Sequence, residues 1–480
     1  MTYRLGPEAM ARLAIALPVG IGLVLVLWDL GGKQLWFDET FQAQLVSLPL
    51  TRFVRRVVTF EIFGAPYHFS LWLWKFLGTD EVALRLPSAL FAVAALPVQF
   101  AIARRVLPTV WAGAAALLLA VNGMWVHYAQ EARPYALWLL LASLATLALV
   151  RAVEQPTRRR WVVYAALLVV TGWTHLMTGF LLAAHALALW LHPDRRAWWR
   201  PAALAAAAGL AALVPIAVAI MTYNQVRWSW MGPVSGQTLW SGLNVLAGEL
   251  RDGLLVAWLI AWALGGAVVL WRWWPDRRGA WVALLVLLWA IFSAVGPWAG
   301  SLVREMYAHR YLIAALPPLM LLGAIGLAAL RPRVLGAALL GGLLVIGMTG
   351  VTDWYGRVER SDWRGATQLV VEQGSAADGL AFFTPRVFDG GALYQYRYYL
   401  RRLESDDRPT MLSLEPGDAP LEAKVERAVA GRDRLWAIGS DFQGADNERA
   451  LRVIERDFAQ VGRWPLAGLE VRLYERPARP

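Results

Sequence analysis

Long apolar runs separated by short basic turns fill the sequence up to about residue 350, and they constrain its fold more than any other feature. A helix that spans a bilayer needs about 20 mostly apolar residues. We expect eleven such helices, at 12–29, 87–104, 110–127, 134–151, 161–175, 177–191, 202–221, 253–271, 281–298, 311–330 and 333–351. Of the 480 residues, 58% are hydrophobic and 17% charged. The chain is therefore predicted to be a polytopic α-helical membrane protein.

The net charge of +11 comes almost entirely from arginine, and the arginines stand at the ends of the apolar runs. This distribution favours a membrane topology signal over a nucleic-acid partner. A cytoplasmic N-terminus places sixteen arginines in inside turns and five in outside loops. The inside set is Arg4, Arg12, Arg104, Arg105, Arg151, Arg158, Arg159, Arg160, Arg195, Arg196, Arg200, Arg272, Arg277, Arg278, Arg331 and Arg333; the outside set is Arg133, Arg227, Arg251, Arg304 and Arg310.

Two domains follow from the change in composition. Residues 1–352 form the transmembrane domain, and the polar segment 353–480 is predicted to be a soluble extracytoplasmic α/β domain. Within the first domain, the outer loop 30–86 contains two stretches, 44–60 and 66–77, that are expected to be helices at the membrane surface. In the second domain, strands are predicted at 379–384, 434–439 and 469–474, and helices at 389–402, 420–430 and 446–457.

Asp38-Glu39 is a carboxylate pair just beyond the first apolar run. Partial burial raises the pKa of a carboxylate toward working pH, so such a pair suits a general base with a supporting group. Asp38 is equally suited to cap the helix that begins here, because Asp is a favoured N-cap residue. The two roles are compatible.

Other polar residues on the predicted outer side are candidates for substrate binding. Glu131, Arg133 and Tyr135 lie at the start of one apolar run, where Glu131 and Arg133 pair with each other or bind a substrate. Arg304, His309 and Arg310 precede another run, where guanidinium groups either clamp a phosphate or anchor an aromatic belt. His68 and His175 are candidate phosphate contacts, although a lone histidine is more often structural.

The sequence also excludes several kinds of chemistry. It contains no cysteine, which rules out disulfides and thiolate metal sites. Its glycine-rich stretches, such as 340–344, lie inside apolar runs and suit helix packing, so no nucleotide cofactor is expected.

The order of these motifs resembles the bacterial branch of the GT-C glycosyltransferases, the relatives of protein O-mannosyltransferases and of the lipid A aminoarabinose transferase. The resemblance runs through Asp38-Glu39, Ala83-Leu-Arg85-Leu-Pro87-Ser88, Glu131-Ala-Arg133-Pro-Tyr135, His309-Arg310-Tyr311 and Asp362-Trp363-Arg364.

The resemblance implies an inverting enzyme of the bacterial inner membrane that uses a sugar on a polyprenyl phosphate, from the extracytoplasmic side. Asp38 would take the proton from the acceptor hydroxyl, supported by Glu39, while Arg310, with His309 or Arg133, would neutralise the leaving phosphate. Relatives often have His-Pro-Pro or Lys-Pro-Pro where this chain has Gly64-Ala65-Pro66-Tyr67-His68, so the resemblance leaves a divalent metal open.

Two other functions remain compatible with the sequence. One is an oligosaccharyltransferase or polymerase that uses a polyprenyl diphosphate, which would need more clustered cations outside. The other is a lipid or sugar transporter, although transporters usually contain internal repeats, and none is visible here. The expected partners are the lipid-linked donor, membrane lipids, and an acceptor glycan, lipid or protein.

Overall fold

The computed structural model describes residues 6–223, 231–248, 252–357, 360–383, 391–403, 421–440, 442 and 445–477. Arg4, Arg227 and Arg251, which contributed to the predicted topology, lie outside the described residues. The chain divides into two compact units. The helical unit comprises Met1–Leu30, Pro49–Gly78 and Val82–Arg357, and the sheet unit comprises Gly31–Leu48, Thr79–Glu81 and Val358–Pro480. The predicted domain boundary at residue 353 stays a prediction.

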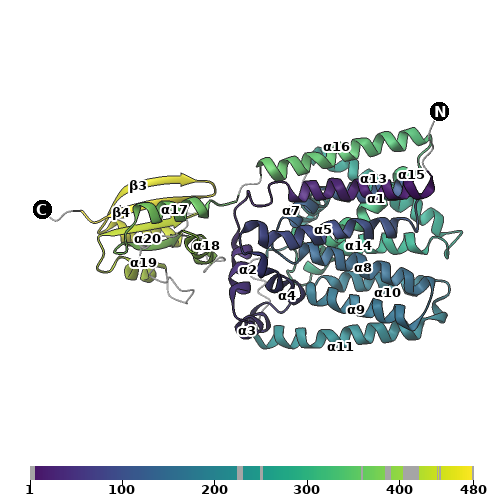
Figure 1. The fold of residues 1–480 in the computed structure, drawn as a ribbon, viewed down its shortest axis with the longest axis horizontal. Coiled ribbons are helices and arrows are strands. Elements are labelled where there is room, and N and C mark those ends of the chain that lie inside the picture. The colour runs from purple at the N-terminus through teal and green to yellow at the C-terminus, as the bar shows by residue number, and fades with distance from the viewer. Residues whose placement is uncertain are drawn as a thin grey trace. The chain divides into compact units, whose positions relative to one another are not determined.

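The helical unit is a bundle of long helices that run side by side (Figure 1). Its helices are α1 (Pro7–Leu27), α3 (Leu50–Phe60), α4 (Ala65–Trp74), η1 (Lys75–Leu77), α5 (Glu81–Ala103), α6 (Thr109–Ala120), α7 (Gly123–Ala129), α8 (Tyr135–Glu154), α9 (Arg158–Thr174), α10 (Thr178–Leu191), η2 (Arg195–Ala197), α11 (Trp199–Tyr223), α12 (Gly236–Leu246), α13 (Asp252–Trp273), α14 (Trp281–Ser301), η3 (His309–Ala315), α15 (Leu316–Ala329) and α16 (Arg333–Arg357).

All eleven expected membrane spans are helical, although 110–127 is divided between α6 and α7, and not every helix is long enough to cross. Among the described residues, eight helices have the length and apolar composition of a span, or nine if α6 and α7, bent by 62°, count as one. The remaining two, α9 and α10, have 17 and 14 residues. Asn122 makes the bend by capping α7, because its side chain accepts a hydrogen bond from the Trp125 amide at 3.1 Å. The chain is thus a multi-pass membrane protein.

Two short helices, α3 and α4, lie across one end of the bundle (Figure 1). The stretch 44–60 is not one continuous helix, because the chain turns at Pro49, which serves as the N-cap of α3. On α3, Phe53 and Val57 are buried one turn apart, while Arg52 and Arg55 are exposed. This helix therefore presents an apolar face to the protein and a basic face outward.

Three glycines allow a close approach between segments that are far apart in sequence. Gly123 begins α7, Gly350 lies in α16, and Gly248 follows α12 with a positive φ of 114°. A Cβ added at Gly350 would overlap the carbonyl oxygen of Gly248, whereas a Cβ added at Gly341 of the same helix would meet nothing within 4 Å. Close backbone packing here depends on glycine, because a side chain at Gly350 would overlap the neighbouring backbone.

We expect Gly350→Ala to destabilise the protein by about 1–3 kcal/mol, because the new methyl group must displace backbone rather than a flexible side chain. Gly341→Ala is the matched control and should be neutral or slightly stabilising, because alanine favours a helix over glycine. The measurement is the thermal aggregation midpoint of the purified protein in detergent. Equal midpoints for the two variants would contradict the proposed close packing.

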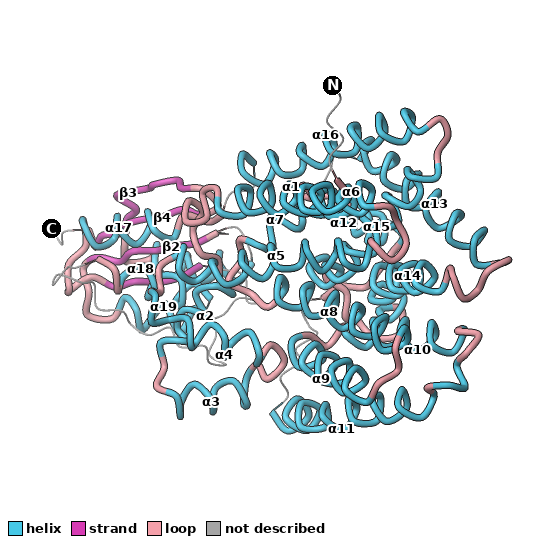
Figure 2. The backbone as a smooth tube through the Cα atoms, turned by 45° about the vertical axis from the view of Figure 1, so that its right-hand side comes forward, coloured by secondary structure: helices cyan, strands magenta, loops and turns pink. Residues whose placement is uncertain are grey.

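The sheet unit contains a four-stranded sheet with the order β1-β2-β4-β3. The strands are β1 (Gly379–Phe383), β2 (Arg434–Gly439), β3 (Ala459–Leu466) and β4 (Leu469–Glu475), and the helices are α2 (Phe37–Ser47), α17 (Trp363–Gln373), α18 (Gly391–Leu400), α19 (Leu421–Val429) and α20 (Ala445–Glu455). Strand β1 pairs with β2 in parallel, and β4 pairs antiparallel with both β2 and β3. Figure 2 shows the strands in magenta among these helices.

Helices cover both faces of this sheet, as the alternation of side chains along β1 shows. Phe383 lies in a core with Val425 of α19 and Ile454 of α20. Phe382, on the opposite face, lies 6.0 Å from the Trp363 ring of α17 and 5.7 Å from the Tyr396 ring of α18. The predicted small α/β domain is confirmed.

Strand β3 is the element of this sheet that sequence analysis missed. Gly462 and Pro465 interrupt its alternating pattern, and the pairing with β4 shifts register between Gln460 and Gly462. The strand lies at the edge of the sheet, where a proline is tolerated because half of the backbone hydrogen-bonding groups have no partner strand.

Candidate active site

Ionisable side chains from several segments gather in the helical unit at the end where α8 begins. The central group is Glu61, which lies between α3 and α4. Its Oε1 accepts a hydrogen bond from Nη2 of Arg133 at 2.8 Å, and its Oε2 lies 3.6 Å from Nε2 of His68. All three residues are buried. Arg133 therefore pairs with Glu61, a residue far from it in the sequence.

Glu61 is the site residue that sequence analysis missed. A signal was available, because Glu61 is the sole acidic residue between Glu39 and Asp80, in a stretch that is otherwise apolar and basic. An isolated carboxylate beside an apolar surface is costly unless it has a partner. The partner, Arg133, lies 72 positions away, and nothing local in the sequence connects the two.

The charges in this cluster set the protonation states of Glu61 and His68. Burial alone would raise the pKa of Glu61, but the positive charges of Arg133 and Arg310 and the contact with His68 hold it below its usual value. Burial lowers the pKa of His68 to about 4, with Glu61 opposing the shift. At neutral pH Glu61 is therefore a carboxylate and His68 an uncharged imidazole.

Arg310 lies in the same region, on η3. Its guanidinium carbon is 5.7 Å from the ring centre of Tyr311, and its positive charge acts on both Glu61 and His175. His175 is held by aromatic contacts: its ring stacks on Trp138 at 4.1 Å and meets the Tyr311 ring edge-on at 4.8 Å. Two guanidinium groups from distant segments, Arg133 and Arg310, thus share one charge cluster.

Tyr135 and Glu131 lie on either side of Arg133 in the chain. The Tyr135 ring lies 5.0 Å from Tyr128 and 6.1 Å from His175. Glu131 is buried, and its Oε1 lies 3.2 Å from Nε2 of His127. Tyr135 therefore lies beside His175, and Glu131 contacts His127.

The polar side chains of Gln130 and Arg85 hold the neighbouring backbone in place. Gln130 donates hydrogen bonds to the carbonyl oxygens of Val26 and Trp28, and its own Oε1 accepts one from Nε1 of Trp354 at 2.7 Å. Arg85 donates to the Leu30 carbonyl at 3.0 Å. These bonds hold the chain that leaves α1, eight residues before Asp38.

Ser88 links the motif at 83–88 to the backbone beside the cluster. Its hydroxyl lies 2.9 Å from the Tyr67 hydroxyl and donates to the Arg133 carbonyl at 3.4 Å. The motif therefore fixes the backbone from which the Arg133 side chain extends.

Asp38 and Glu39 stand in the first turn of α2, in the sheet unit. The expectation that Asp38 caps this helix was wrong: the N-cap is Trp36, and Oε2 of Glu39 accepts the hydrogen bond from the Trp36 amide at 3.3 Å. Glu39 is fully buried, while Asp38 is partly exposed. The structure thus gives Glu39 a capping contact, and the catalytic roles of both residues stay predictions.

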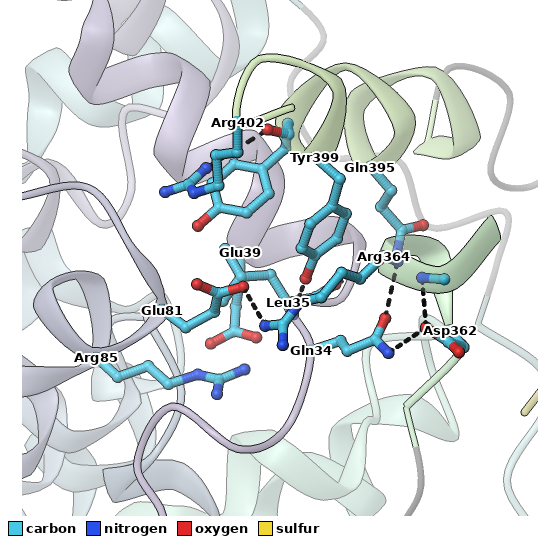
Figure 3. Close-up of polar contacts among 12 residues, drawn as sticks. Gln34, Leu35, Glu39, Glu81, Arg85, Asp362, Arg364, Gln395, Tyr399 and Arg402 are labelled. Carbon is cyan, nitrogen blue, oxygen red and sulfur yellow. Dashed lines mark hydrogen bonds and ion pairs between the residues drawn. The ribbon is translucent and has the colours of Figure 1, made fainter. Parts of the chain in front are cut away.

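The motif Asp362-Trp363-Arg364 holds the segment that carries α2 (Figure 3). Nε2 of Gln34 donates to Asp362, and Oε1 of Gln34 accepts from the Arg364 amide at 3.1 Å. The Leu35 amide donates to the Tyr399 hydroxyl at 2.8 Å. The residues shortly before Asp38 therefore have fixed partners in the C-terminal segment.

An ion pair within the sheet unit ties residues 79–81 to this C-terminal segment. Nη2 of Arg364 lies 2.6 Å from Oε1 of Glu81 (Figure 3). Arg402 and the Tyr398 hydroxyl both donate to the Thr79 carbonyl, Tyr398 at 3.2 Å. Burial raises the pKa of Tyr398, so it remains protonated and able to donate.

The remaining candidates lie near the start of η3. His309 is partly buried, with its ring 5.6 Å from that of Tyr307, and Arg304 is exposed. Burial also raises the pKa of Tyr307 to about 12. Within the part of the chain that the structure describes, no three His, Asp or Glu side chains gather as a metal site requires.

Comparisons with known proteins identify the fold that holds these residues. A family model described as "Dolichyl-phosphate-mannose-protein mannosyltransferase" matches residues 66–222. The structure is similar to ArnT from Cupriavidus metallidurans bound to undecaprenyl phosphate, with a TM-score of 0.63, 14% identity, and coverage of 96% of this chain and 98% of that one. No curated protein gives a significant sequence match.

An archaeal enzyme has a related fold. The oligosaccharyltransferase of Archaeoglobus fulgidus matches with a TM-score of 0.58 at 10% identity, over 94% of this chain and 73% of that one. The same archaeal protein is also known in complex with an inhibitory peptide and a dolichol phosphate. The resemblance found in the sequence is confirmed: the chain has the GT-C fold, which it shares with the lipid A aminoarabinose transferase and with oligosaccharyltransferases.

Proposed function

We propose that this protein is an inverting glycosyltransferase that moves a sugar from a polyprenyl phosphate to an acceptor hydroxyl on the extracytoplasmic side of a bacterial inner membrane. The observation that carries the proposal is the buried charge cluster around Arg133 and Arg310 in a GT-C fold. ArnT, which has a similar fold, binds undecaprenyl phosphate, and the family model that matches residues 66–222 describes a transferase that uses a lipid-phosphate sugar.

The two guanidinium groups suit the leaving group of this reaction. As the bond between the anomeric carbon and the phosphate oxygen breaks, negative charge develops on the phosphate. Cations that are already in place stabilise that charge without reorganisation. Arg133 is held by Glu61 at 2.8 Å, so it is oriented before the donor binds, while Arg310 supplies a second positive charge.

Asp38 is the proposed general base. Its carboxylate would take the proton as the acceptor oxygen attacks the anomeric carbon from the side opposite the phosphate, which inverts the configuration and releases the polyprenyl phosphate. Glu39 caps α2 at the Trp36 amide, so we assign it the task of fixing the helix on which Asp38 stands.

The number of cations favours a monophosphate donor. Among the described residues of the cluster, Arg133 already has Glu61 as its partner, and Arg310 supplies the other positive charge. A diphosphate would bring more negative charge to the same place. An oligosaccharyltransferase that uses a polyprenyl diphosphate is therefore the second candidate.

The sheet unit provides a hollow that suits an acceptor. A cavity of about 370 Å³ lies between α2 and α18, and its lining includes Gln44, Asp80, Tyr398 and Arg402. Amide, carboxylate and guanidinium groups of this kind bind the hydroxyl groups of a saccharide. We therefore propose that the sheet unit selects the acceptor.

The direct test is incubation of the purified, reconstituted protein with radiolabelled polyprenyl-phosphate sugars and with polyprenyl-diphosphate sugars. We expect release of free polyprenyl phosphate with the first class of donor. Turnover of diphosphate donors alone would identify the second candidate. Movement of labelled lipid across the vesicle membrane without sugar transfer would identify a transporter.

Arg310→Ala is expected to reduce kcat/KM for the donor by at least about tenfold, because a charge-assisted contact to the phosphate is lost. Arg333→Ala, at an exposed arginine where α16 begins, is the control and should leave turnover unchanged. Unchanged donor affinity and turnover in Arg310→Ala would remove this residue from the proposed phosphate site.

A further inference from the structure

A second concentration of arginines lies at the far end of α8, away from the charge cluster. Helix α8 has 20 residues, from Tyr135 at the cluster to Glu154, and a helix of this length rises about 30 Å. The chain then turns and enters α9 at Arg158. The proposed transfer reaction uses none of the residues at this turn.

A cavity of about 730 Å³ opens between α8 and α9 at this turn. One part of its wall is apolar and includes Leu144, Leu147 and Val163. The other part is basic and includes Arg151, Arg159 and Arg160. The cavity is therefore amphipathic, with cations at the turn and hydrocarbon along the helices.

The positive charge of this cavity is not balanced by a carboxylate in its lining. Glu154, on the last turn of α8, is engaged elsewhere, because its carboxylate pairs with Arg105 at 2.9 Å. Two other cavities at basic turns differ in this respect, since their linings include Asp194 and Asp276. The α8–α9 cavity thus has a net attraction for an anion.

A hydrogen bond between the two sides of the turn holds the arginines in place. Nη1 of Arg160 donates to the Arg151 carbonyl at 2.8 Å, which joins the two sides of the turn. On α9, Val162 and Val163 are 59% and 46% exposed. The apolar wall therefore continues onto a helix face that is open to the surrounding hydrocarbon.

We propose that this cavity binds an anionic phospholipid, with the phosphate of its headgroup on the arginines and the first part of an acyl chain along the apolar wall. Each arginine near such a headgroup contributes about 1 kcal/mol. A free phosphate would use the guanidinium groups but leave the apolar wall uncovered. The shape of the cavity favours the lipid, and the site is independent of the proposed sugar transfer.

The test uses two matched pairs of variants of the full-length protein, reconstituted in equal mixtures of phosphatidylglycerol and phosphatidylcholine. Arg159→Gln changes a cavity arginine, and Arg158→Gln changes its exposed neighbour outside the cavity. Val163→Gln changes the apolar wall, and Val162→Gln changes an exposed valine beside it. Native mass spectrometry after extraction into mild detergent measures the retained lipid.

We expect the native protein to retain phosphatidylglycerol over phosphatidylcholine, and Arg159→Gln and Val163→Gln each to lower that retention by roughly fivefold. Both neighbouring variants should behave as the native protein. The proposal fails if both members of each pair lose lipid equally, if the two lipids are retained equally, or if excess inorganic phosphate displaces the bound lipid. Because all four positions lie at the protein surface, thermal midpoints should confirm that folding is unchanged.

Discussion

Asp38→Asn is expected to reduce the rate of sugar transfer by about a thousandfold, within the range that removal of a general base produces. Asparagine keeps the size of the side chain but cannot accept the proton from the acceptor hydroxyl. Helix α2 should be preserved, because its N-terminal cap depends on Glu39 and the Trp36 amide rather than on Asp38. Single-turnover transfer from a radiolabelled polyprenyl-phosphate sugar is the measurement.

The control for this variant is Asp29→Asn, which makes the same change nine residues earlier. Asp29 is exposed and has a φ of 50°, a conformation that asparagine adopts readily. The Asp29→Asn variant should therefore transfer sugar at the native rate. If Asp38→Asn also retained the native rate, another residue would have to act as the base.

Glu61→Gln is expected to have the second large effect, and that effect should appear in both stability and activity. The variant leaves the guanidinium of Arg133 buried without its carboxylate partner, and breaking a buried ion pair on one side costs about 3–5 kcal/mol. It also frees Arg133 to reorient, so donor turnover should fall at least about tenfold. Thermal midpoint and kcat/KM for the donor are the two measurements.

The control is Glu154→Gln, which breaks the pair with Arg105 at a comparable distance of 2.9 Å but on a more exposed surface. Such pairs contribute about 0–1 kcal/mol, so this variant should be nearly native. A double variant, Glu61→Gln with Arg133→Gln, should recover much of the stability and none of the activity. Recovery of both would mean that the buried pair has a structural role alone.

Much of the helical unit could be predicted from the sequence, because its elements depend on local composition. Each expected span is helical, since some 20 apolar residues in a row can satisfy their backbone groups in a bilayer by forming a helix. Composition could not predict where a helix is interrupted. Pro49 divides the surface stretch into two helices, and Asn122 starts a new helix at a bend of 62°. These depend on single residues within a continuous apolar or amphipathic pattern.

Some residues of the candidate site could be predicted from the sequence, but Glu61 and the contacts among them could not. Arg133, Arg310 and His175 were identified from their positions at the ends of apolar runs, and the structure brings them into one electrostatic cluster. A capping role for Asp38 was expected from adjacency, and no neighbouring residue indicated Glu61 as a partner of Arg133. In the structure, Arg133 bonds to Glu61 and the cap comes from Glu39.

The sequence by itself determined which segments form apolar helices, where basic turns fall and which residues carry ionisable groups, because these properties depend on a few neighbouring residues. The tertiary structure alone decided the partners. Glu61 meets Arg133 across 72 positions, and Gln34 meets Asp362 across 328. Such pairs form because buried charges and polar groups must be compensated, and the packing of distant segments selects which group compensates which.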